Sequence, residues 1–407
     1  MCSGLISGAK HWYRKAGVRS LLYHTAVYLV GSFVVRVTRG GYSNVLLSSE
    51  EFVEQHADGC YLELPEDTAG LSEQLCLDLV PLTDDDSLKF DNSPMFTFDT
   101  PFVVHIENAY VTGPHATVVT SDGNVLSDNL TRNVDRVRWM LNSAIASRPY
   151  RTSRALRDTG VNMDLETVQV GTVLYHHSSN YYHWMLEQLL KIRYVEHYES
   201  RTGEEVTLLV SANAPSFVYE GLKRLGYDGS RYTIWYGEPI RIQKCVIPSF
   251  PEPTPKSLEW LRQRMKAPAD SPADEKRRVY ISRQNAEKGR RVENYDEICK
   301  VMERYGIESV ACESMTLEEE IELFSSAELI VGVHGAGLTA MIWAEDATVL
   351  EIFNGVVKGP FYVLSDLLGH NYSALAGTPV GNSRYPKNRD IVLDPEELDR
   401  HLDRITT

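Results

Sequence analysis

The spacing of hydrophobic and polar positions changes partway along the chain. Between about residues 41 and 150 the apolar runs are short and are broken by turn residues. Ala116–Thr120, the pair Asp122-Gly123 and the resumed apolar pair Val125-Leu126 are the clearest example. Such runs predict β-strands joined by tight turns. From about residue 161 onward strand-like and helix-like patterns alternate, so the chain is expected to continue as an α/β protein.

The alternation predicts a parallel sheet covered on both faces by helices. Strands are expected at Thr167–Leu174, Val206–Val210, Val279–Ser282, Ser309–Cys312, Leu329–Val333 and Val349–Phe353, and helices at Tyr181–Tyr198, Phe217–Leu225, Tyr295–Tyr305, Leu317–Ser326 and Tyr362–Leu368. Six prolines between Pro248 and Lys276 interrupt this pattern, with one helix expected around Ser257–Met265. Because 407 residues exceed one ordinary core, we predict two α/β domains with a crevice between them.

Four segments follow from this division. They are an amphipathic N-terminal segment (1–40), a first domain with a β-rich start (41–250), a proline-rich linker (251–278) and a second domain (279–407).

Charge and cysteine content narrow the classes of function. The chain has 41 Lys and Arg against 56 Asp and Glu, a net charge of -15, which disfavours a general nucleic-acid-binding protein. A local basic cluster can still bind a small anion. The six cysteines are scattered, with no C-x-x-C pair, which argues against a zinc site or a disulfide framework and favours reduced thiols in the cytosol.

The longest apolar run, Ser20–Val35, is too short and too polar for the roughly 18–20 apolar residues of a membrane-spanning helix. Arg36 follows it where a signal peptide needs small residues. Basic residues flank the run on both sides. Two interpretations remain open, an amphipathic segment on an anionic membrane surface (residues 10–39) and a helix packed on its own domain.

The strongest local signal is LIVGVHGAGL at Leu329–Leu338. A buried strand leads directly into His334-Gly335-Ala336-Gly337, where glycines let the backbone approach a ligand and a following helix offers free N–H groups. This pattern favours a pyrophosphate cradle, in which His334 adds a donor. The alternative is that both glycines only close a tight turn. The dinucleotide fingerprint G-x-G-x-x-G is absent.

Three further groups have candidate chemistry. Lys276–Arg291 contains seven basic residues and one acid, and its Arg283 should lie at the sheet edge of the glycine turn, although a solvated basic loop explains such a run equally well. His183 and Glu187 are four residues apart, which on a helix suits either a general base or a surface pair. Asp84-Asp85-Asp86 fits a solvated acidic loop better than a metal site.

In this order the segments resemble glycosyltransferase family 61, over about residues 100–375. The resemblance rests on NYYHWMLEQL at Asn180–Leu189, YISR and RRVEN around Arg283 and Arg291, the Glu313 segment, LIVGVHGAGLT and VLEIF. The prokaryotic surface-polysaccharide branch of that family is the expected one.

The resemblance implies a GT-B fold, two Rossmann-like domains facing a central cleft, with inverting chemistry and no metal or cofactor besides a nucleoside-diphosphate sugar. Glu187, aided by His183, would be the catalytic base, although many members have Asp at the position of Glu187. Donor binding would fall to Arg283, Arg291, Asn294, Glu313, His334, Gly335, Ala336, Gly337, Leu338 and Glu351.

The expected reaction is hexosyl or pentosyl transfer to a hydroxyl of a lipid-linked glycan or surface-polysaccharide precursor, in the cytoplasm or on the inner face of the membrane. Two alternatives are a non-catalytic nucleotide-sugar-binding scaffold and a nucleotide-sugar epimerase. The epimerase would need a dinucleotide fingerprint and a Tyr-x-x-x-Lys pair, and neither pattern is found.

Overall fold

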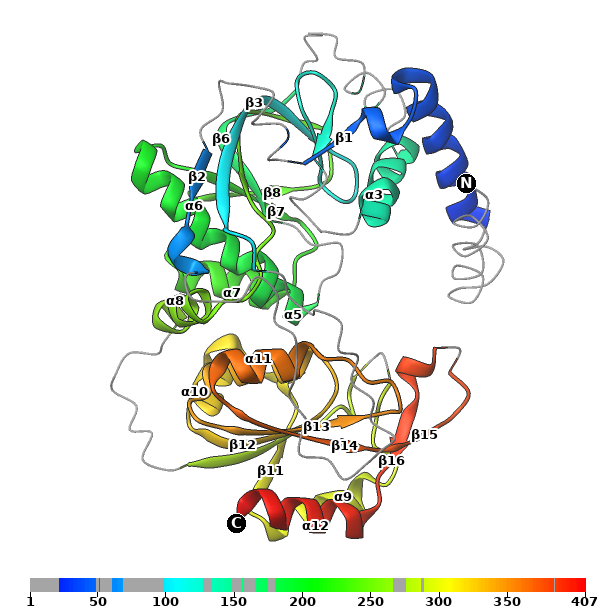
Figure 1. The fold of residues 1–407 in the computed structure, drawn as a ribbon, viewed down its shortest axis with the longest axis vertical. Helices are drawn as coiled ribbons and strands as arrows, with labels where there is room; N and C mark the ends of the chain where they lie inside the picture. The colour runs from blue at the N-terminus through cyan, green and yellow to red at the C-terminus, as the bar shows by residue number, and fades with distance from the viewer. Residues whose placement is uncertain are drawn as a thin grey trace. The chain divides into compact units, whose positions relative to one another are not determined.

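The chain folds as a mixed α/β protein with parallel sheets (Figure 1). The computed structural model describes residues 22–48, 51, 61–68, 98–126, 134–147, 152, 156, 165–174, 180–265, 276–286, 289–383 and 385–407. The chain divides into two compact units. Unit 1 comprises Met1–Ala69, Thr100–Ser179 and Leu186–Pro251, and unit 2 comprises Gly70–Asp99, Asn180–Met185 and Glu252–Thr407.

Unit 2 contains an all-parallel sheet in the order β11-β10-β12-β13-β14. The strands are β10 (Arg277–Ile281), β11 (Ile307–Val310), β12 (Ala327–Val333), β13 (Thr348–Phe353) and β14 (Asn371–Ala376). From β10 the chain adds β11 on one side and β12 on the other, so the strand order reverses between β10 and β12. In open parallel sheets, ligands bind beyond the carboxyl ends of the strands at such a reversal.

Helices cover both faces of this sheet. Figure 1 shows α9 (Tyr295–Arg304) and α12 (Pro395–Thr406) on one face, with α10 (Leu317–Ser325) and α11 (Pro360–Leu368) on the other. Ile298 and Met302 of α9 and Leu398 and Leu402 of α12 pack with strand residues in one buried cluster. Thr316 begins α10 with a capping box, and Gly369, in a left-handed conformation, ends α11.

Unit 2 has further elements among its described residues. They are α5 (Tyr181–His183), α8 (Pro255–Met265), the 3-10 helices η4 (Cys312–Ser314), η5 (Ala336–Trp343) and η6 (Pro386–Asn388), and the antiparallel pair β15 (Thr378–Val380) and β16 (Asp390–Val392).

Unit 1 has a mixed sheet in the order β1-β5-β4-β3-β9-β6-β7-β8, with β2 paired to β3. Its parallel part consists of β6 (Thr167–Leu174), β7 (Thr207–Ser211), β8 (Tyr232–Trp235) and β9 (Ile240–Pro248). The earlier strands are β1 (Leu46–Leu47), β2 (Tyr61–Glu63), β3 (Phe102–Thr112), β4 (Thr117–Val119) and β5 (Val125–Leu126). β3 joins the two parts by pairing antiparallel to β9.

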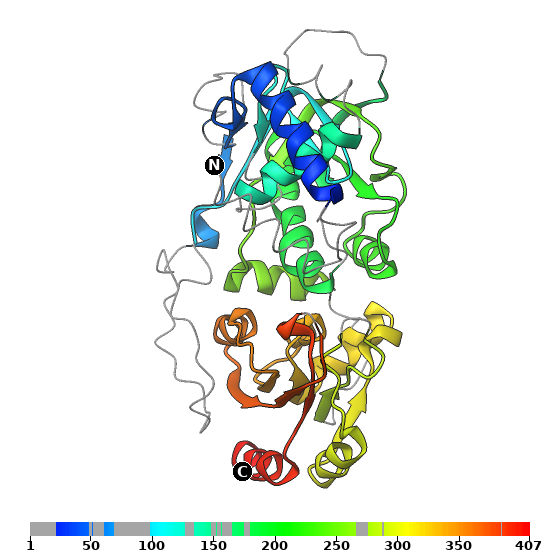
Figure 2. The same cartoon turned by 90° about the vertical axis from the view of Figure 1, so that its right-hand side faces the viewer.

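Among its described residues, unit 1 has a helix over residues 22–39, α3 (Val134–Ser147), α6 (Leu189–Thr202), α7 (Ser216–Arg224) and the short helices η1 (Tyr42–Asn44) and η2 (Pro65–Asp67). The π-helical turn η3 (Trp184–Gln188) spans the boundary between the two units. Figure 2 shows the helix over residues 22–39, in dark blue, beside α3. Asp67 of η2, whose side chain is fully buried, accepts two hydrogen bonds from Arg193 of α6 and so ties η2 to that helix.

The α/β prediction is confirmed, and the expected strands and helices from residue 167 to 368 are present with small shifts at their ends. Three local features differ from the expectation. The helix after the glycine turn is 3-10 and not α, the helix from Tyr181 contains the π-helical turn, and Pro248 is the last residue of β9. A proline is tolerated at a strand end, where its missing N–H costs no ladder bond.

Candidate functional site

The strand reversal in unit 2 brings two sequence-distant turns together. β10 ends at Ile281 and leads into Arg283, while β12 ends at Val333 and leads into His334 and Gly335. Because β10 and β12 pair in parallel, with Ile281 opposite Gly332, both turns leave the same edge of the sheet. Arg283 and the glycine turn therefore meet at the place where a parallel sheet of this topology binds a ligand.

The glycine turn presents backbone N–H groups at this edge. The first bond inside η5 runs from the Leu338 N–H to the Gly335 carbonyl, so the amides before Leu338 have no intrahelical partner. Gly335 also allows a close approach, since a Cβ atom there would lie 2.2 Å from Nη1 of Arg283. At the far end of η5, Arg262 of α8 donates to the carbonyls of Ile342 and Ala344. The turn is thus held at both ends.

Two arginines concentrate positive charge beside the turn. Arg290 donates from Nη1 to the His334 carbonyl at 2.5 Å, and Arg283 donates from Nη2 to the Gly289 carbonyl at 3.4 Å. Burial, and then the charge of Arg283, lowers the pKa of Arg290 to about 10, although Glu351 opposes this shift. Burial also lowers the pKa of Arg283. Both groups remain charged at neutral pH, and a bound anion would relieve the cost of holding them together.

The Nε atoms of these two arginines also favour an anionic ligand. Both are buried and have no hydrogen-bond partner among the described residues. An unpaired buried polar group costs about 1–3 kcal/mol, and more when it is charged. Arg290 also adopts a left-handed backbone conformation with φ of 64°, a strained state for a non-glycine residue that occurs often at functional sites.

Lysines extend this positive region. Partial burial, then the charges of Lys387 and Arg290, lowers the pKa of Lys358, which follows β13. We call Arg283, Arg290, Lys358 and Lys387 the carboxyl-edge cluster. In a chain of net charge -15, this gathering of cations is suited to an anionic ligand with several negative oxygens.

A buried carboxylate orients the histidine of the turn. His334 Nδ1 lies 2.5 Å from Oε1 of Glu351, whose side chain is fully buried, and Tyr372 of β14 donates to Oε2 of Glu351 at 2.6 Å. The Phe353 ring stacks on the imidazole at 5.7 Å. Glu351 therefore acts through His334, whose other ring nitrogen, Nε2, is left for a ligand.

The start of the NYYHWMLEQL segment belongs to the same unit as the glycine turn. Asn180 begins α5 by accepting a hydrogen bond from the Tyr182 N–H at 2.9 Å. Tyr181 donates to the buried Glu320 of α10, and burial followed by the Glu320 charge raises the pKa of Tyr181, so that it stays protonated. The Phe361 ring makes edge contacts with Tyr182 at 5.7 Å and with His334 at 5.6 Å. α5 is thus fixed next to the turn.

The predicted catalytic pair lies along one helical segment. His183 ends α5 and is partly exposed, and Glu187 lies in the π-helical turn. The boundary between the units falls between Met185 and Leu186, so His183 is grouped with unit 2 and Glu187 with unit 1. Their expected placement assumed α-helical spacing, and the π-helical turn changes this spacing. π-helical turns are rare in proteins, and those that occur are often found at functional sites.

The remaining predicted residues divide into two groups. Glu313 is exposed in η4 and close enough to Arg283 for its charge to raise the pKa of that guanidinium against the effect of burial. Arg291 is exposed and donates from Nη2 to the Ala286 carbonyl at 3.1 Å. The Asn294 side chain bonds both the N–H and the carbonyl of Leu393. The contact of Arg291 supports the loop after β10, and the contacts of Asn294 support the junction between α9 and β16.

Sequence reasoning missed Arg290, Tyr372 and the two lysines of the carboxyl-edge cluster. Arg290 stood beside Arg291 in the basic run, and no pattern distinguished the two. In the structure both Gly289 and Arg290 have positive φ, and Arg290 donates to the His334 carbonyl at the strand edge.

Among the described residues no group of three or more His, Cys, Asp or Glu side chains is placed to hold a metal ion. Asp84-Asp85-Asp86 lies outside the described residues.

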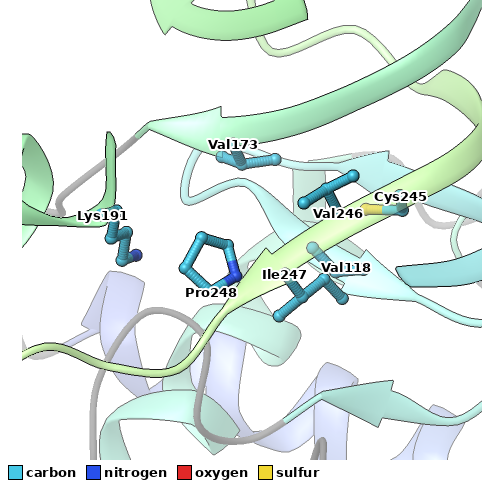
Figure 3. A pocket seen from close by; sticks show the side chains of 7 residues that line it. All are labelled: Val118, Val173, Lys191, Cys245, Val246, Ile247 and Pro248. Atoms are coloured by element: carbon cyan, nitrogen blue, oxygen red, sulfur yellow. The ribbon is translucent and has the colours of Figure 1, made fainter. Parts of the chain in front are cut away.

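Figure 3 shows a cavity in unit 1 lined by Val118, Val173, Lys191, Cys245, Val246, Ile247 and Pro248. Its volume of about 10 Å³ has room for roughly one water, and burial raises the pKa of Cys245 to about 12. Neither a sugar nor a nucleotide fits there.

Part of the chain is similar to known glycosyltransferases. Residues 181–350 match the family model described as Glycosyltransferase 61, a span that runs from α5 into β13. Over 143 residues, 34% of this chain, the sequence is 27% identical to an EGF domain-specific O-linked N-acetylglucosamine transferase of Drosophila melanogaster. The matched segment covers 25% of that protein's length. Both findings support a glycosyltransferase of family 61.

We expect Gly335→Ala to weaken anion binding, because the new Cβ would displace the Arg283 guanidinium. A charge-assisted hydrogen bond is worth about 1.5–3 kcal/mol, so the Kd of pyrophosphate, measured by isothermal titration calorimetry, should rise at least about tenfold. Gly229→Ala is the control, since a Cβ there meets nothing within 4 Å. Unchanged pyrophosphate binding by Gly335→Ala would mean that the turn is not part of an anion site.

Proposed function

We propose that this protein is an inverting, metal-independent glycosyltransferase that moves a sugar from a nucleoside-diphosphate donor to an acceptor hydroxyl. The observation that carries the proposal is the carboxyl-edge cluster at the strand reversal of unit 2. Two of its four residues, Arg283 and Arg290, lie within the segment 181–350 that matches Glycosyltransferase 61. A diphosphate is the anion that this arrangement suits best. It can accept hydrogen bonds from several amides and from two arginines at once.

Donor binding follows from the contacts at this edge. The diphosphate would lie against the amides of the glycine turn, with the guanidinium groups of Arg283 and Arg290 on its oxygens. Arginine suits this role because its planar fork donates two parallel hydrogen bonds to phosphate. His334, oriented by Glu351, would donate or accept one further hydrogen bond through Nε2.

The same groups would lower the barrier of the reaction. When the bond between the anomeric carbon and the phosphate oxygen breaks, negative charge grows on the leaving nucleoside diphosphate. Donors fixed in advance stabilise that charge without reorganising, and removing one typically costs about 10²–10³ in rate. A set of arginines and amides can supply this stabilisation where other enzymes use a metal ion.

In the acceptor step, Glu187 would be the general base, aided by His183. The carboxylate takes the proton of the acceptor hydroxyl, and that oxygen attacks the anomeric carbon from the face opposite the diphosphate, so the configuration inverts. The position of Glu187 in a π-helical turn, directly after α5, supports this role. The mechanism requires a GT-B arrangement, in which both units face one cleft, and this arrangement is part of the proposal.

The proposal extends to the substrates. The Drosophila relative is named as an O-linked N-acetylglucosamine transferase, which supports a hexosamine donor and makes hexosyl transfer the first reaction to test. For the acceptor we propose a lipid-linked glycan or a surface-polysaccharide precursor of a prokaryotic cell, modified in the cytoplasm.

Nucleotide binding should depend on Arg290 far more than on Arg291. In a thermal-shift screen of UDP, GDP, dTDP, CMP and NAD, we expect one nucleoside diphosphate to raise the Tm both with and without EDTA. At 100 times its Kd a ligand adds about 2.7 kcal/mol of stability. The neighbouring arginines form a matched pair, and the shift should disappear in Arg290→Ala and persist in Arg291→Ala.

Other outcomes of this screen are informative. A shift with NAD alone, or one that EDTA removes, would contradict the proposal. A shift lost in Arg291→Ala and retained in Arg290→Ala would move the phosphate contact to Arg291. A nucleotide that binds without any transfer to the acceptors tested would favour a non-catalytic scaffold.

Turnover, in contrast, should depend on Glu187. Glu187→Gln keeps the size of the side chain and removes its basicity, so we expect kcat to fall at least about 10²-fold, the lower end of the usual range for a general base. The nucleotide-induced Tm shift should remain as in the wild type. The assay measures release of the nucleotide during sugar transfer or during hydrolysis of the donor. Retention of most of the activity would show that another group is the base.

A further inference from the structure

The helix over residues 22–39 is fixed to unit 1 by one face. Val27 and Val35 of this helix are buried, and Gly31 lies between them on the same face. The contact at Gly31 is close, because a Cβ atom there would lie 2.2 Å from Oδ1 of Asn142 in α3. At the end of the helix, Arg39 donates to the Asp122 carbonyl at 2.8 Å and to Asn124 Oδ1 at 2.6 Å. This packing fixes which face turns outward.

The outward face is apolar. Leu22 is 63% exposed, Leu29 56%, Phe33 69% and Val37 64%. Their spacings of seven, four and four residues place them along one side of a helix. Of the eleven exposed large hydrophobic side chains among the described residues, seven belong to this helix. We call Leu22, Leu29, Phe33 and Val37 the apolar stripe.

The N-terminal part of the sequence, which contains the stripe, is positively charged, although the chain as a whole is acidic. Residues 1–49 contain no Asp or Glu and six basic residues, namely Lys10, Arg14, Lys15, Arg19, Arg36 and Arg39. This segment therefore carries +6, and the rest of a chain of net charge -15 carries -21. The surface that covers the apolar stripe should be negatively charged.

We propose that the apolar stripe docks on an anionic lipid bilayer, with the helix lying in the plane of the membrane surface. In this mode an apolar face enters the boundary of the headgroups by about 5–10 Å, while basic residues contact anionic headgroups. No helix among the described residues is long and apolar enough to cross a bilayer. A second copy of the chain is a poorer occupant, because it would bring the same +6 segment against this one.

The test is sedimentation of the full-length protein with vesicles of phosphatidylcholine, alone or mixed with phosphatidylglycerol. We expect binding to the mixed vesicles, much weaker binding to phosphatidylcholine alone, and a loss of binding as salt rises, because ions screen the attraction. Equal binding to both kinds of vesicle, or no binding to either, would overturn the proposal.

Variants test the stripe and the charge separately. Leu29→Ser with Phe33→Ser should weaken the binding to mixed vesicles about tenfold or more, since burying such a side chain is worth about 1.5–3 kcal/mol. Arg36→Gln should weaken it about fivefold, as expected from about 1 kcal/mol per basic residue near the surface. The matched control is Ile234→Ser with Tyr236→Ser, two exposed apolar residues elsewhere in unit 1, which should bind as the wild type.

Two further measurements distinguish lipid docking from a folding defect and from a protein interface. The melting temperature of each variant should equal that of the wild type, because the altered side chains lie outside the core. If Leu29→Ser with Phe33→Ser unfolds the protein, the vesicle binding of Arg36→Gln decides whether the helix docks on anionic lipid. The contradicting outcome has two parts. The wild type would be a dimer in light scattering and would not bind vesicles, and Leu29→Ser with Phe33→Ser would be a monomer. That result would make the stripe a protein interface and refute lipid docking.

Discussion

The site depends on one constraint of chain topology. In unit 2 the parallel strand order reverses between β10 and β12, so the turns after these two strands leave the sheet at one edge. That geometry places the Arg283 guanidinium against Gly335 so closely that no other residue type fits at the turn without moving it. At the same edge Glu351 orients His334, and Phe361 contacts both His334 and Tyr182 of α5.

Charge gives this edge its chemical character. Arg283 and Arg290 are partly buried beside each other, which is unfavourable unless a negative partner is present, and Glu351 offsets only part of the cost because it bonds His334 and Tyr372. Such an arrangement suits an anionic ligand. The proposed docking of the apolar stripe uses the same principle, since it pairs the basic residues of segment 1–49 with anionic headgroups.

Much of this edge could be predicted from sequence. A continuous apolar run before His334 indicated a buried strand, and Arg283 was expected at the same edge because it follows another strand. The resemblance selected Arg291 and not Arg290, since the contact of Arg290 with the turn depends on the loop's positive φ angles. Glu320 belongs to an acidic run typical of a solvated surface but is buried against Tyr181. The 3-10 helix η5 is apolar on every side, so periodicity could not distinguish it from an α-helix.

Hydrogen–deuterium exchange on the full chain, with and without the nucleoside diphosphate that binds, tests the central claim most directly. Amides that donate to phosphate oxygens exchange more slowly. We expect protection in the peptides that cover residues 282–291 and 334–343, at the carboxyl ends of β10 and β12. Protection confined to unit 1, for example around β7 and β8, with no change at the glycine turn, would contradict it.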